Sequence, residues 1–193
     1  EEAGFINAVV AKIQPEDAEW DAADYDYNVV RWSSEPDGNL LGIGPSVSNP
    51  LTGEIISADV VNKLLAIKLG YNYRKLYGYT EDNDPLMQYI TNLTLHEVGH
   101  VLGLRHNFRG SYLYSPDEIH DKNITGNVLM SSVMDYDPIN IAPEGVEQGI
   151  YFSTEPGVYD KWAVKFGYTP NLTEEERTAL LQQSVKRELT FGT

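Results

Sequence analysis

Three of the four histidines in this chain fall within eleven residues, at His96, His100 and His106. Residues four apart in an α-helix share one face, with Cβ atoms about 5–6 Å apart, so His96 and His100 can approach one metal ion. Glu97 lies one step round the helix, where its carboxylate can reach a water on that ion without ligating it. Imidazole nitrogen is a preferred ligand of zinc, so this spacing predicts a zinc centre.

A straight helix would carry His106 away from the metal. Gly103 stands where the chain must turn, and glycine adopts positive φ without steric cost. Three protein ligands leave the fourth zinc position open, which is the catalytic arrangement. There, zinc lowers the pKa of bound water to about 7 and polarises a carbonyl, while Glu97 accepts the proton as general base. A coincidental helix with buried histidines is the alternative, but Gly103 and His106 at these offsets make it improbable.

The run from His96 to His106 resembles the metzincin signature H-E-x-x-H-x-x-G-x-x-H. Met134 lies 28 residues after His106, within Ser131–Tyr136, and resembles the methionine turn of that clan. Several further segments resemble one bacterial branch, the zinc-dependent metalloproteases of the DUF4953/DUF5117 type. They are His106-Asn107-Phe108, Ser132–Tyr136, Tyr159–Ala163, Phe166–Tyr168, Gly53–Ile56 and Tyr27–Trp32.

The resemblance implies roles for two more residues. Met134 would pack as a soft platform under the histidines without binding zinc. Tyr136 stands at the offset where some metzincins hold a tyrosine that ligates zinc at rest and swings to hydrogen-bond the tetrahedral intermediate. The alternative is a tyrosine packed under the site whose hydroxyl bonds to backbone.

Composition limits the classes of partner. The 193 residues contain 29 acidic and 14 basic side chains, a net charge of −15, which disfavours nucleic acid and anionic membranes. No apolar run reaches the about 20 residues of a membrane-spanning helix. Cysteine is absent, which excludes disulfides and favours a bacterial protein. We expect a protein or peptide substrate and an extracellular, periplasmic or outer-surface location, and leave the oligomeric state open.

The N-terminal half is expected to supply a twisted sheet and a helix. Residues 1–4 resemble the end of a helix, so the chain is interpreted as an N-terminally truncated catalytic domain. Residues 6–13 read as a buried strand and 27–32 as the next strand. Residues 53–60 also alternate as a strand. By resemblance they are the candidate antiparallel edge over the substrate cleft, with 41–47 as a rival.

Helices are expected at four places. Residues 61–77 form the first, with Val61, Leu64, Leu65 and Leu69 facing the core. The zinc helix follows, capped by Asp84 with Pro85 in its first turn. Residues 157–166 should pack behind the methionine turn, and residues 173–188, capped by Thr173, should form a polar final helix. The long loop 107–133 is expected to build most of the specificity pocket, with Phe108, Tyr112 and Leu113 giving an apolar preference.

Together these features predict one α/β domain over residues 1–193 with a metzincin-like (zincin) fold. An upper subdomain, 1–103, holds a twisted mixed sheet and the active-site helix; a smaller, irregular and helical lower subdomain covers 104–193. The predicted activity is that of a zinc endopeptidase. The alternatives are a non-proteolytic zinc-containing surface module and a zinc hydrolase of non-protein amides.

The acidic clusters are compatible with structural calcium. None of them matches the twelve-residue calcium loop, so a solvated acidic surface is the favoured interpretation.

Overall fold

The computed structural model describes residues 2–34 and 40–193, and its elements follow one another as small strands and then helices. The strands are β1 (Val30–Ser33), β2 (Gly42–Ile43), β3 (Ser46–Ser48), β4 (Ile55–Ala58) and β5 (Val60–Lys63). The helices are α1 (Leu64–Tyr77), α2 (Pro85–Val101), α3 (Lys122–Thr125), α4 (Val158–Tyr168) and α5 (Glu174–Leu181). Short 3-10 turns occupy Gly110–Tyr112, Gln182–Val185 and Arg187–Leu189.

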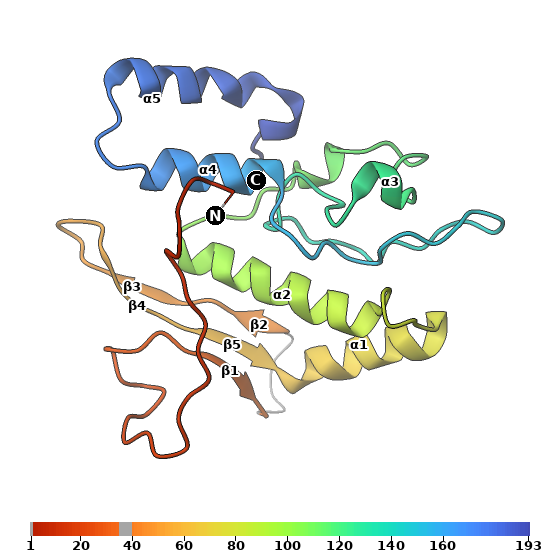
Figure 1. Cartoon of the computed structure of the whole chain (residues 1–193), viewed down its shortest axis with the longest axis horizontal. Coiled ribbons are helices and arrows are strands. Elements are labelled where there is room, and N and C mark those ends of the chain that lie inside the picture. Colours follow the sequence, from red (N-terminus) through yellow and green to blue (C-terminus); the bar gives the residue numbers. More distant parts are fainter. Residues whose placement is uncertain (1, 35–39) are drawn as a thin grey trace.

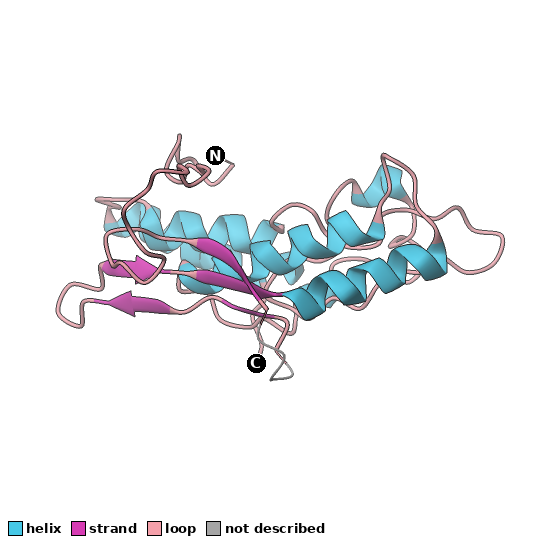
Figure 2. Cartoon of the chain, turned by 90° about the horizontal axis from the view of Figure 1, so that it is seen from below, coloured by secondary structure: helices cyan, strands magenta, loops and turns pink. Residues whose placement is uncertain are grey.

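The sheet is mixed, as predicted. β5 is its middle strand, parallel to β1 and antiparallel to β2, while β3 and β4 form a separate antiparallel pair. α2 packs against β5, β2 and α1. It runs through the middle of the molecule, between the sheet and α4 (Figure 1). Seen from below, the strands line one side and α1 continues from the end of the sheet (Figure 2).

Two strand predictions need correction. The predicted buried strand 6–13 is wrong, because Ile6 is 83% exposed and Ile13 96% exposed. A strand needs a hydrogen-bonding neighbour, and none of the strands in the described part of the chain pairs with this segment. The predicted strand 53–60 is two strands, β4 and β5, interrupted at Asp59. Asp59 instead accepts a hydrogen bond from Val29 N through its carboxylate.

The predicted edge 53–60 does not lie along the active-site helix in the way expected. Its β4 part pairs with β3 in the separate sheet, and β5 is paired on both sides, whereas β2 is the antiparallel edge strand of the three-stranded sheet and packs against α2. The rival segment 41–47 contains this strand. The expected helical turn at residues 1–4 lies partly outside the described residues, and residues 2–4 form only a turn. The composition of residues 35–50, rich in glycine, proline, serine and asparagine, predicts a loop, and residues 35–39 of it also lie outside the described residues.

The first helix begins three residues later than predicted, since residues 61–63 belong to β5. Its core face is also different. Leu64 and Leu65 are each 46% exposed, whereas Ala66 is fully buried and Leu69 packs against the core. Gly70 sits where α1 meets α2, and a Cβ there would lie 2.7 Å from Leu86 Cδ1. The absent side chain lets the two helices approach closely.

The core that supports α2 is aromatic. Tyr89 and Phe152 have ring centroids 5.1 Å apart, and Tyr73 lies 5.6 Å from each. Phe152 is 1% exposed. Aromatic side chains bury large areas and prefer such tilted or edge-on contacts, which fix the angle between helices. This cluster joins α1, α2 and the chain segment that follows the methionine turn.

The ends of α2 are set as predicted. The Asp84 carboxylate accepts a hydrogen bond from Leu86 N, and Pro85 occupies the first turn. At the other end Gly103 has φ of 84°, and Leu104 N donates to Gly99 O. A non-glycine residue is strained in this left-handed region, so Gly103 is what turns the chain toward His106.

The last two helices lie where they were predicted, and the second has the predicted cap. Gly157 caps α4, and Tyr159 N donates to Ser131 O, which places this helix against the methionine turn as expected. Thr173 caps α5 through a capping box with Glu176. α5 is shorter than predicted, because it ends at Leu181 and gives way to two 3-10 turns.

Candidate metal centre and adjoining cavity

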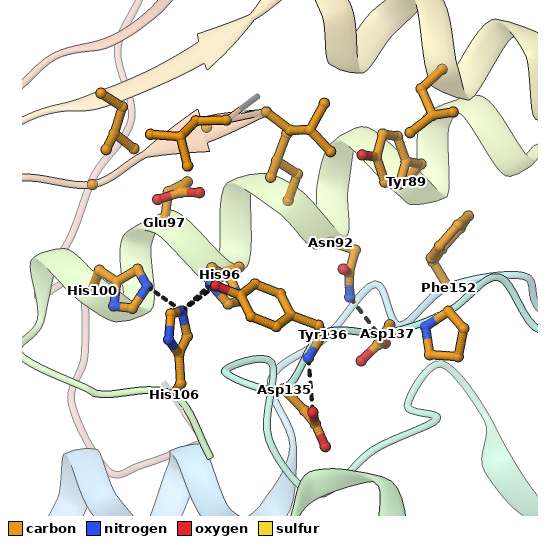
Figure 3. A pocket seen from close by; sticks show the side chains of 18 of the residues that line it. Tyr89, Asn92, His96, Glu97, His100, His106, Asp135, Tyr136, Asp137 and Phe152 are labelled. Atoms are coloured by element: carbon orange, nitrogen blue, oxygen red, sulfur yellow. Dashed lines mark hydrogen bonds between the residues drawn. The ribbon is translucent and has the colours of Figure 1, made fainter. Parts of the chain in front are cut away.

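The three histidines converge. Their potential ligand atoms lie within 4.8 Å of one another. His106 Nε2 is 3.3 Å from His96 Nε2 and 3.1 Å from His100 Nε2 (Figure 3). Zinc–nitrogen bonds of about 2.0–2.1 Å in a tetrahedron hold the ligands about 3.3 Å apart. The donor set and its spacing therefore fit a zinc ion.

Backbone carbonyls orient two of the rings. His96 Nδ1 lies 2.7 Å from Val133 O, and His100 Nδ1 lies 3.0 Å from Leu104 O. A carbonyl can only accept, so each Nδ1 carries the proton and each Nε2 presents its lone pair to the centre. Burial lowers the pKa of His96 to about 4 and, together with the charge of His100, also lowers that of His106. Low pKa values favour the neutral imidazole that binds metal.

Glu97 lies next to the triad and close to β2. The residue is 5% exposed, and burial raises its pKa to about 7. A Cβ on Gly42 would lie 2.7 Å from Glu97 Oε1, and one on Gly44 would lie 2.2 Å from the backbone oxygen of Glu97. Two glycines therefore allow the edge strand to pass directly over this carboxylate.

Met134 lies beneath α2, where the methionine turn was expected. It is fully buried, and a Cβ on Gly99 would lie only 2.3 Å from its sulfur. The turn is held by the buried carboxylate of Asp160, which accepts from Ser132 Oγ at 2.6 Å, Val133 N at 2.8 Å and Gly157 N at 2.9 Å. Burial nevertheless raises the pKa of Asp160.

Tyr136 reaches the histidines from the end of this turn. Its hydroxyl is 2.9 Å from His106 Nε2, and its ring stacks on His96 at 5.4 Å between centroids. The side chain is 63% exposed. The hydroxyl bonds to a histidine nitrogen, so the alternative of a packed tyrosine bonded to backbone does not describe it.

The model of a protein family described as Met-zincin matches residues 79–193, more than half of the chain. The chain belongs to the Met-zincin family. No curated protein and no solved structure matches it. The match covers the three histidines, Glu97, Met134 and Tyr136, and the mixed α/β architecture agrees with the metzincin-like fold expected from the sequence.

Membership of a Met-zincin family implies zinc, and the three histidines are the residues that can hold it. Within residues 2–34 and 40–193, they form the one cluster of three or more metal-binding side chains. The acidic segments form no such cluster in these residues, so structural calcium has no support.

No helix within residues 2–34 and 40–193 is long and apolar enough to cross a membrane.

A cavity of about 680 Å³ adjoins the triad. Its walls are residues 40–45, one face of α1 and α2, and residues 135–139 with Phe152. The prediction that loop 107–133 builds most of this pocket is wrong. Phe108 N instead donates to Gly192 O, which ties the loop to the C-terminal segment. Phe108 does lie beside the centre, with its ring 5.8 Å from that of His106.

The sequence interpretation missed three groups of residues around the site. Gly42 and Gly44 belong to no sequence motif, and only the fold brings them to Glu97. Asn107 is fully buried and joins the methionine turn to the C-terminal segment, since its backbone N donates to Met134 O and its side chain to Thr190 O. Asn92 and Asp137 line the cavity. Asn92 stands four residues before His96, so helical spacing alone could have placed it on the histidine face.

Proposed function

We propose that this chain is a zinc-dependent endopeptidase. The observation that carries the proposal is the convergence of three histidine Nε2 atoms beside the buried carboxylate of Glu97, at the mouth of a cavity and under an edge strand. Bound zinc would supply Lewis acidity to the scissile carbonyl and to the attacking water.

Glu97 is the general base and acid of the proposed reaction. Its carboxylate takes a proton from the attacking water and delivers it to the amine as the carbon–nitrogen bond breaks, so no other proton donor is needed. Burial raises the pKa of Glu97 above the ordinary value of a carboxyl group, which strengthens it as a base for the water proton.

Two other parts of the site hold the substrate and its developing charge. The hydroxyl of Tyr136 donates a hydrogen bond to the oxyanion once it moves from His106 Nε2. The free edge of β2 pairs with the substrate backbone, which lets one site accept many peptide sequences. Strand addition requires the close passage over Glu97 that Gly42 and Gly44 allow.

The test compares zinc-loaded wild type with Glu97→Ala and Glu97→Gln in casein and gelatin digestion. Removing the general base should reduce the rate by about 10²–10⁴-fold. Glu147→Gln, on an exposed loop, is the matched control and should retain wild-type activity. Zinc content and thermal melting are measured on each sample, which separates loss of chemistry from loss of metal or fold.

Two outcomes would replace the proposal. A folded, zinc-loaded wild type as inert as Glu97→Ala on every protein and peptide would favour a non-proteolytic zinc module. Hydrolysis of small amides that depends on Glu97, without peptide cleavage, would favour a non-protein amide as substrate.

A further inference from the structure

Next to the triad the cavity is lined by the histidines, Glu97 and residues 135–136, whereas the rest of its wall is mostly apolar with one polar pair, Asn92 and Asp137. Its apolar lining comes from Leu41, Leu69, Tyr73, Leu93, Ile139 and Phe152. Asn92 of α2 faces Asp137 of the segment that follows Met134, and the two side chains are joined across the cavity wall (Figure 3). A mostly apolar wall that carries one carboxylate away from the triad, that of Asp137, is suited to a side chain with an apolar stem and a polar end.

Asp137 is incompletely satisfied. Its Oδ2 accepts from Asn92 Nδ2 and from Ser153 Oγ, both at 3.3 Å, which is long for a hydrogen bond. Its Oδ1 is buried without a hydrogen-bond partner. Among the described residues, the ion pairs Arg74–Asp84 and Lys161–Glu2 do not include it.

Burial disfavours the ionised form of Asp137 and raises its pKa to about 7, so a ligand that brings a cation would stabilise the ionised carboxylate at this place. The last torsion of an aspartate side chain is soft, so Oδ1 can turn toward the cavity with little strain. A charge-assisted hydrogen bond to that oxygen would supply the missing partner.

The polar pair is separated from the histidine triad along α2. Asn92 precedes His96 by four residues, which is about 6 Å along the helix axis. Tyr136, Leu93 and Asp137 line the same cavity, so a substrate side chain that enters it from the triad can contact Leu93 as well as Asp137. Lysine and arginine have stems of this kind, which pack along apolar surface while the charged end finds a polar partner.

We propose that Asp137 is a specificity-determining residue that makes the enzyme prefer lysine or arginine next to the scissile bond. The inference rests on the proposed endopeptidase function, and it replaces the apolar preference expected from the loop 107–133. Asn92 is a positioning residue here, because it holds Oδ2 of Asp137 from the neighbouring helix.

The first experiment is cleavage of a peptide library by the zinc-loaded chain, read by mass spectrometry. It is followed by kcat/KM for a matched peptide pair that carries arginine or citrulline, its neutral isostere, at the selected position. Wild type should cleave the arginine peptide at least about tenfold more efficiently, the range of a charge-assisted hydrogen bond. Asp137→Asn should bring the ratio close to one, and Asp117→Asn, the same change on an exposed loop, should leave it at the wild-type value.

The second experiment measures binding rather than hydrolysis. Fluorescence anisotropy of the two labelled peptides is followed with Glu97→Gln and with Glu97→Gln/Asp137→Asn. Tighter binding of the arginine peptide by the first variant alone supports the role of Asp137, even if wild type cleaves no peptide and the endopeptidase proposal fails. A wild type that prefers leucine, phenylalanine or citrulline over arginine overturns the inference without any variant. An arginine preference that persists in Asp137→Asn also overturns the inference.

Discussion

At the scale of single residues, Tyr136 gives the clearest prediction. Its hydroxyl lies 2.9 Å from His106 Nε2, yet the side chain is 63% exposed and free to move. If it donates to the oxyanion only in the transition state, Tyr136→Phe should lower kcat by about 10²–10³-fold with little change in KM. Steady-state kinetics on a peptide substrate measures both constants.

Tyr25 provides a matched control, because it is also 63% exposed and lies far along the chain from the site. Tyr25→Phe should behave as wild type. An unchanged kcat in Tyr136→Phe, with zinc bound, would remove this hydroxyl from the mechanism and leave it as a neighbour of His106.

At the scale of elements, α2 determines where two histidines, Glu97 and Asn92 lie. Asp84 starts this helix in two ways: it caps Leu86 N, and it forms an ion pair with Arg74 of α1. Asp84→Ala should destabilise the fold by about 1 kcal/mol through the lost cap, which is about 2–4 °C in Tm for a domain of this size. Asp84→Asn should keep most of the cap and lose the ion pair. Urea unfolding of both variants measures the two contributions.

The same carboxylate gives a pH dependence with a defined sign. The hydrogen bond from Arg74 lowers the pKa of Asp84, so folding favours the ionised form. Its contribution is present above the unfolded pKa of about 4 and is lost as pH falls through the folded value. The stability difference between wild type and Asp84→Asn should therefore shrink between pH 7 and pH 3. An equal difference at both pH values would show that the ion pair does not stabilise α2.

At the scale of the whole molecule, the sequence was informative where the structure is local. The histidines, Glu97 and Gly103 lie on one helix and its turn, so spacing and turn chemistry were sufficient to predict their convergence. Asp84 and Thr173 were predicted as caps for the same reason. The position of Met134 came from a family resemblance instead, because nothing local in the sequence links it to Gly99.

The parts that could not be predicted depend on contacts between distant segments. Asp137 meets Asn92 across 45 residues, and β2 covers Glu97 across more than 50. The apolar run 6–13 indicated a buried strand, but an apolar run does not show whether a neighbouring strand is present. Val61 was assigned to a helix for a similar reason, since a short apolar run fits a strand or a helix until its partners are known.

The metal centre links these distant segments, so removal of zinc should affect the whole fold. His96 lies on α2, and its Nδ1 bonds to Val133 O of the methionine turn. Zinc at about 100 times its Kd stabilises the native state by about 2.7 kcal/mol, or roughly 5–10 °C in Tm for this size. A chelator should lower Tm by this amount and zinc, but not magnesium, should restore it, as followed by calorimetry. His100→Ala, which breaks the ligand set, should melt at one temperature with or without chelator. A wild-type Tm that does not respond to chelator or to added zinc would contradict metal binding at this site.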